Sequence, residues 1–88
     1  MPEYNGHPNR HYWNVALWVD NDYGTYQFAR ECLRRHSNVR EAVTEFTAWA
    51  AEAYPNGKTP DGYAFTPATV RHALVQLRRD EPELRPRP

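Results

Sequence analysis

The sequence predicts an all-α protein, a compact four-helix single domain with a long ordered loop before the last helix. Apolar residues recur at helical spacing in several segments, and all eight prolines lie outside those segments. The chain has 88 residues, enough for one hydrophobic core but too few for a cofactor cleft between two domains. We expect one helical domain over residues 1–80 and a Pro/Arg-rich C-terminal tail over residues 81–88.

The first expected helix contains the segment "HYWNVALWV", residues 11–19, which is apolar on all sides of a helical wheel. A strand is the alternative, because the β-branched Val15 and Val19 suit a sheet. We favour a helix, since the chain has no second strand-like run to pair with it and Asn9 is a plausible N-cap. A helix that is apolar all round is expected to be the buried, central one.

The second expected helix covers residues 23–36, and the corner before it resembles part of a calcium-binding loop. Asp20, Asp22 and Glu31 fall where such a loop places carboxylates. However, the place that needs an oxygen ligand holds Gly24, and the place that needs a glycine holds Thr25. We therefore interpret Asp20-Asn21-Asp22 as a sharp turn between two helices in which Asp22 caps the second.

The third and fourth expected helices cover residues 39–54 and 67–79. Asn38 with Glu41 resembles a capping box for the third helix, and Thr66 followed by Pro67 marks the start of the fourth. The loop between them, "YPNGKTPDGYAFT", has two turn signals, Pro-Asn-Gly and Pro-Asp-Gly. The residues expected in the core are Trp13, Leu17, Leu33, Phe46, Trp49, Val70 and Leu74.

Composition limits the classes of function. Eleven Lys and Arg balance eleven Asp and Glu, so the chain lacks the strong positive field of many nucleic-acid-binding proteins. The balance is uneven, because residues 67–88 carry five arginines against three acids. A single cysteine excludes an internal disulfide framework, and no apolar run resembles a membrane span or a signal peptide. We expect a cytoplasmic protein that does not contact a membrane.

Residues with reactive side chains do not form a recognisable catalytic motif. His7, His11, His36 and His72 raise the possibility of a zinc site, but no cysteine pair supports it. Cys32 and His36 are four residues apart on one helix face, which suits a nucleophile and base but equally a buried cysteine. The sequence has no phosphate-binding glycine loop, no G-x-S-x-G and no H-E-x-x-H. We expect no enzymatic activity, no cofactor and no metal.

Residues 4–31, "YNGHPNRHYWNVALWVDNDYGTYQFARE", resemble a family of short, uncharacterised proteins encoded mainly by phages and other mobile elements. The family's pattern is Tyr-Asn-Gly-Trp, an Asn, Glu-Thr-Trp, Leu-Trp, then Asn-Asp followed by Gly and Tyr. "KTPDGYAFTPATVRHAL" is similar to the ending of some relatives, whereas His7 replaces the family's tryptophan and His11-Tyr12 its Glu-Thr. The matching residues are Tyr4, Asn5, Gly6, Asn9, Trp13, Leu17, Trp18, Asn21, Asp22, Gly24 and Tyr26.

The resemblance implies a counter-defence protein of the anti-CRISPR type, which binds and inhibits a host defence complex such as a CRISPR effector in a bacterial cytoplasm. Two surfaces are candidates for the contact. One is the loop pair Tyr63 and Phe65, whose alternative role is to pack the loop onto the core. The other consists of acidic residues, whose alternative role is ordinary solvation: Asp20, Asp22, Glu41, Glu45 and Glu52.

Two further hypotheses come from other classes of function. A small phage regulator would bind DNA or RNA through the last helix and the tail, with phosphate contacts from Arg71, His72, Arg78, Arg79, Arg85 and Arg87. The neutral net charge argues against it, and arginines near a helix C-terminus also stabilise the helix dipole. An assembly protein would self-associate, through an exposed Trp18 for example.

Overall fold

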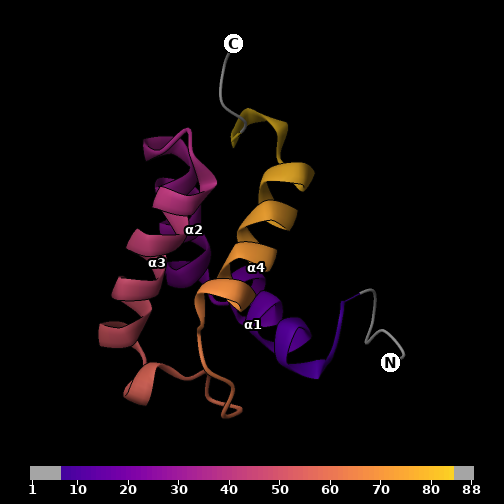
Figure 1. The fold of residues 1–88 in the computed structure, drawn as a ribbon, viewed down its shortest axis with the longest axis vertical. Helices are drawn as coiled ribbons and strands as arrows, with labels where there is room; N and C mark the ends of the chain where they lie inside the picture. Colours follow the sequence, from indigo (N-terminus) through magenta and orange to yellow (C-terminus); the bar gives the residue numbers. More distant parts are fainter. Residues whose placement is uncertain (1–6, 85–88) are drawn as a thin grey trace.

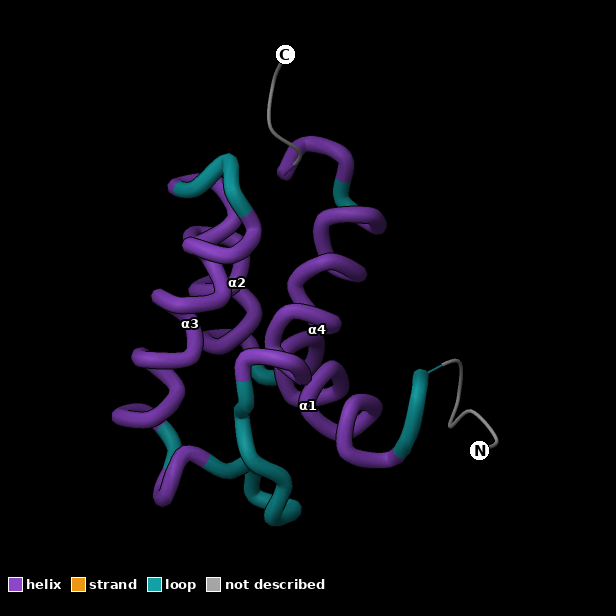
Figure 2. The backbone as a smooth tube through the Cα atoms, viewed as in Figure 1, coloured by secondary structure: helices purple, strands orange, loops and turns teal. Residues whose placement is uncertain are grey.

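The computed structural model describes residues 7–84 and confirms the all-α class (Figure 1). Its helices are α1 (Arg10–Asn21), α2 (Tyr23–Arg35), α3 (Val39–Ala53) and α4 (Pro67–Asp80), with short 3-10 turns η1 (Pro55–Gly57) and η2 (Pro82–Leu84). Over the described range, Figure 2 shows helices joined by loops, without a strand. Tyr4, Asn5 and Gly6 of the family pattern, and the tail residues 85–88 with Arg85 and Arg87, lie outside the described residues.

Each helix begins where its polar cap residue predicts. The N-cap side chains accept hydrogen bonds from backbone N–H groups of the first turn, which have no partner inside the helix. The capping box forms in α4, where Thr66 and Thr69 bond reciprocally at 3.1 and 3.0 Å, rather than in α3. The caps and their distances are Asn9 to Tyr12 N, 3.1 Å; Asp22 to Thr25 N, 3.3 Å; Asn38 to Arg40 N, 2.8 Å; and Thr66 to Thr69 N, 3.1 Å.

The turn between α1 and α2 is as tight as the sequence predicts. α1 ends at Asn21, α2 begins at Tyr23, and Asp22 alone separates them. The backbone N–H of Asp22 still bonds to Trp18 O at 3.1 Å, while its carboxylate already caps α2. The helix-to-helix interpretation of this segment, and the choice of helix over strand for residues 11–19, are therefore confirmed.

α1 is not the central helix, which corrects the sequence-based expectation. It packs on α2 and α4 only, whereas α2 and α4 each contact all three other helices. In Figure 1, α2 and α3 lie side by side and α4 runs next to them. The predicted core is right for four residues and wrong in part, because Trp13, Leu17 and Trp49 are only half-buried. On α1 the buried side consists of Asn14, Val15, Ala16 and Val19.

Aromatic rings fill the space between α2, α3 and the loop that precedes α4. Phe46 is fully buried, and Phe28 stacks on Trp49 with ring centroids 4.6 Å apart. Tyr54 and Phe65, whose ring centroids lie 4.8 Å apart, bring the loop into the same cluster. Such ring pairs stabilise a core beyond their buried area. The remaining buried apolar residues include Leu33, Ala42, Val70, Leu74 and Leu77.

The loop of residues 54–66 is ordered, because polar side chains of α1 hold it. Asn14 is buried; its amide Nδ2 donates to Asp61 Oδ2 at 2.8 Å, and its Oδ1 accepts from the Thr59 hydroxyl at 2.7 Å. Trp18 Nε1 donates to the same Asp61 oxygen at 3.0 Å, and His11 Nε2 donates to Ala64 O at 2.8 Å. α1 and the loop therefore form one unit.

The two turn signals in this loop require positive φ, as their glycines indicate. Gly57 has φ 64° and Gly62 has φ 92°, in the region that only glycine adopts readily. Asn56 also has a positive φ, 58°, which the sequence analysis did not anticipate, although asparagine tolerates that conformation better than most residues.

The segment after α4 packs onto the domain as far as Leu84. Leu84 has 2% of its surface exposed, in a region expected to have little to bury. Arg30 on α2 contacts Glu81 at 3.3 Å and Glu83 at 3.6 Å, and the Tyr26 hydroxyl donates to Glu81. One apolar residue between Pro82 and Pro86 gives no periodic signal, so the sequence pattern did not reveal this contact.

Candidate binding surface

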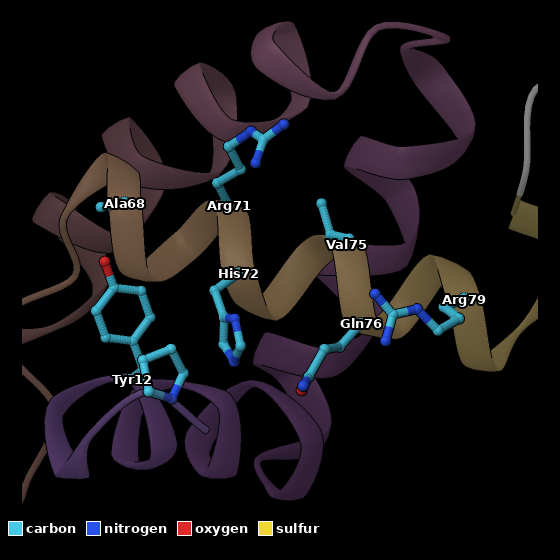
Figure 3. Close-up of a pocket in the computed structure, with 8 residues that line it drawn as sticks. Tyr12, Ala68, Arg71, His72, Val75, Gln76 and Arg79 are labelled. Carbon is cyan, nitrogen blue, oxygen red and sulfur yellow. The ribbon is translucent and has the colours of Figure 1, made fainter. Parts of the chain in front are cut away.

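A groove lies between α1 and α4, with a volume of about 500 Å³. Figure 3 shows Tyr12 of α1 facing His72 of α4, with Arg71 on the opposite side of the helix at the same level and Arg79 farther along α4. This α1–α4 groove brings together three of the four residues predicted on the last helix. Its lining residues are Pro8, Tyr12, Ala68, Arg71, His72, Val75, Gln76 and Arg79.

His72 is fixed in this groove as a hydrogen-bonding ring. Its Nε2 lies 2.8 Å from Nδ1 of His7, and the Tyr12 ring packs edge-on at 5.2 Å. Partial burial, then the positive charges of His7 and Arg79, lower the pKa of His72. The neutral ring is therefore favoured, because a hydrogen bond between two histidine nitrogens needs one acceptor. His72 serves the groove as a polar surface and not as a permanent cation.

The arginines of α4 divide between two faces. Arg71 and Arg79 line the α1–α4 groove, whereas Arg78 Nη1 donates to Ser37 O at 3.5 Å beside the junction of α2 and α3. The nucleic-acid hypothesis places all of them among its phosphate contacts. The structure therefore separates Arg78 from the other predicted nucleic-acid contacts.

A second groove, between α3 and α4, adjoins the first. Its volume is about 480 Å³, and Arg71 and Ala68 line both grooves. Arg40 of α3 lies in it, a residue that the sequence patterns did not mark as functional. Only the packing of α3 against α4 brings Arg40 and Arg71 to one groove, so no local signal could have found the pair. This α3–α4 groove is lined by Asn38, Val39, Arg40, Val43, Thr44, Pro67, Ala68 and Arg71.

Two of the predicted acidic contact residues are already paired within the chain. Glu45 contacts Arg35, and it contacts His36 Nε2 at 2.8 Å; Glu41 lies 3.3 Å from His36 Nδ1. The hydrogen bond from His36, and then the charge of Arg35, lower the pKa of Glu45. A partner that uses these carboxylates must displace basic groups of this chain.

The other predicted acids lie elsewhere. Asp22 caps α2 and accepts a hydrogen bond from the Tyr54 hydroxyl at 3.3 Å. Partial burial, and then the negative charge of Asp80, raise the pKa of Asp20. Glu52 is exposed on α3. Glu41 and Glu45 line one hollow together, whereas the other three acidic residues lie elsewhere.

The predicted aromatic contacts are engaged with the core and the loop. Phe65 has 6% of its surface exposed, and Tyr63 is half-buried with its ring 5.5 Å from His11. This is the alternative role that the sequence left open. Trp18, predicted as an exposed contact in an assembly protein, is half-buried and bonded to Asp61. Tyr23, 77% exposed, is the large hydrophobic side chain that the described surface presents to solvent.

Cys32 belongs to the core and does not pair with His36. The cysteine is fully buried, and this burial raises the pKa of its thiol to about 12, so the reactive thiolate is scarce. His36 directs its ring at Glu41 and Glu45 instead. Within residues 7–84, no group of three or more His, Cys, Asp or Glu residues is placed to hold a metal ion. No helix in the same range has the length and apolar character to cross a membrane.

Comparisons with known proteins agree with the expected membership of an uncharacterised family. Residues 1–82 match one protein family over nearly the whole chain. Searches of curated proteins and of solved structures found no match. The chain belongs to DUF7249, a family of unknown function.

Proposed function

We propose that the protein acts by binding, as a phage-type counter-defence protein that inhibits a host defence complex in the bacterial cytoplasm. A CRISPR effector is the first complex to test. The proposal retains the function that the sequence resemblance implies, and it moves the contact surface from the acidic residues to α4.

The observation that supports this proposal is the α1–α4 groove. Arg71, Tyr12 and His72 gather there from two helices, and arginine and tyrosine are the residue types that often carry most of the energy of a protein interface. The groove is also preorganised, because His72 is held by His7 and Tyr12. A preorganised surface loses little side-chain entropy on binding.

Phage plating tests the function. The protein is expressed in cells with an active CRISPR system and in matched cells that lack the effector, and both are infected with a targeted phage. Rescue of plating in the CRISPR-active cells alone is the expected result. Unchanged plating in those cells, with the protein present in the cytoplasm, would contradict the anti-CRISPR proposal.

A small regulator that binds DNA or RNA remains the second candidate. It is favoured by the meeting of Arg71, His72 and Arg79 in one groove, where they could contact phosphates. Replacing Arg71 by Ala should then abolish a salt-sensitive shift of the nucleic acid in a gel. A shift that persists in the Arg71 variant would remove this candidate.

A further inference from the structure

We propose that the α1–α4 and α3–α4 grooves together bind one acidic segment of a partner protein, with apolar side chains between its carboxylates. The two grooves adjoin at Arg71 and Ala68, which line both of them. A single segment can therefore cross α4 at this point and reach from Tyr12 to Arg40. This inference rests on the proposed function and names the chemistry of the partner's contact.

The charge of the two grooves selects an anionic occupant. Arg40 and Arg71 are exposed there, and no described residue forms an ion pair or hydrogen bond with either guanidinium group. No aspartate or glutamate is found among the described residues that line the two grooves, although the whole chain has a net charge of zero. A local positive surface on a neutral protein suits a partner with complementary charge.

The apolar part of the lining favours a peptide over a nucleic acid. Val39, Val43 and Val75 contribute aliphatic surface between the arginines. Interfaces with nucleic acid are more polar and more densely basic than this, and single strands are bound by stacking bases on open aromatic faces. Tyr12, the aromatic residue in the groove, already packs against His72. Leucine-like side chains fit such valine-lined hollows better than bases do.

The direction of the side chains agrees with a segment that crosses α4. In Figure 3, Arg71 and Val75 project to the side of α4 away from α1, whereas His72 and Gln76 project toward α1. The side of α4 away from α1 therefore carries the charged Arg71, and the side toward α1 carries the polar His72 and Gln76. Arg71 is the contact that the two grooves share.

Fluorescence anisotropy with the full chain tests the surface directly. The probe is a short fluorescein-labelled peptide of glutamate and leucine in equal number. We expect Arg71→Ala and Arg40→Ala each to weaken binding about tenfold, because each removes a charge-assisted contact. Arg34→Ala is the matched control: Arg34 is an exposed arginine on α2 that lines neither groove, and its loss should leave the affinity unchanged.

Four results would overturn the inference. They are the absence of peptide binding, wild-type affinity in the Arg71→Ala and Arg40→Ala variants, equal binding of a lysine–leucine peptide, and tighter binding of oligothymidylate than of the acidic peptide. Circular dichroism verifies that the exposed substitutions leave the helices intact. The assay contains no host component, so its failure removes the acidic-segment surface alone, whereas a failed plating test removes the counter-defence function.

Discussion

Replacing Asn14 by alanine should destabilise the protein, although the sequence alone suggests the opposite. Alanine is the better helix former, and residues 11–19 are otherwise mostly apolar. In the structure, however, Asn14 is 2% exposed and joins α1 to the loop before α4 through Thr59 and Asp61. The substitution therefore removes two contacts at a buried site.

The magnitude follows from what the substitution leaves behind. The Thr59 hydroxyl is 3% exposed and loses its acceptor, and an unpaired buried polar group costs about 1–3 kcal/mol. A small cavity adds to this, whereas the exposed Asp61 carboxylate regains water. We expect a loss of about 2–3 kcal/mol in the free energy of unfolding. This is a large part of the roughly 5–10 kcal/mol that stabilises a domain of this size.

Urea unfolding followed by tryptophan fluorescence measures the loss. With a slope of about 1 kcal/mol per M, the midpoint should fall by about 2–3 M. Asn21→Ala makes the same chemical change at an exposed position of α1 and should shift the free energy of unfolding by less than about 0.5 kcal/mol. Equal midpoints for wild type and Asn14→Ala, or the same loss in a Thr59→Val background, would refute the reasoning.

Three further predictions concern pH, the C-terminal segment and the cysteine. The lowered pKa of His72 means that the unfolded chain binds a proton more readily than the folded protein does. Stability should therefore fall as the pH drops through the unfolded value of 6.5. His72→Gln should reduce the difference in urea midpoint between about pH 7.5 and about pH 5.5. An equal difference in the variant would show that another group causes it. Leu84→Ala should lower the free energy of unfolding by about 2–4 kcal/mol, whereas Glu83→Ala, at an exposed neighbour, should have little effect; equal losses would contradict the burial of Leu84. Because burial raises the pKa of Cys32 to about 12, iodoacetamide should label it in urea and not in the folded protein, and equally fast labelling of both would be inconsistent with a core cysteine.

Helices and caps were predictable because their signals are local. Asn9, Asp22, Asn38 and Thr66 each bond within their own first turn, so a short stretch of sequence contains both partners. The central position of α2 and α4 was not predictable in this way. It depends on how the helices pack together, and the structure leaves bulky residues of α1, such as Trp13, half-buried.

The candidate surface was predictable only in part for the same reason. The arginines of α4 were recognised from a basic stretch of sequence. That Arg71 and Arg78 lie on different faces of the helix depends on which elements pack beside each face. Arg40 joins Arg71 across helices that begin 28 residues apart, at Val39 and Pro67. The sequence gives only a weak indication of the role of Asn14, as a single amide within an apolar run. Its role is clear only from the structure, where the Pro-Asp-Gly turn lies against it.

An affinity pull-down shows whether the protein binds a host defence complex. The tagged protein is incubated with lysate of a CRISPR-bearing host, with and without nuclease, beside the Arg71→Ala Arg40→Ala variant. We expect a subunit of a defence complex to co-purify in stoichiometric amount, to survive nuclease treatment and to be depleted with the variant. Recovery of nucleic acid alone, lost after nuclease, would contradict binding to a host complex and support the regulator instead.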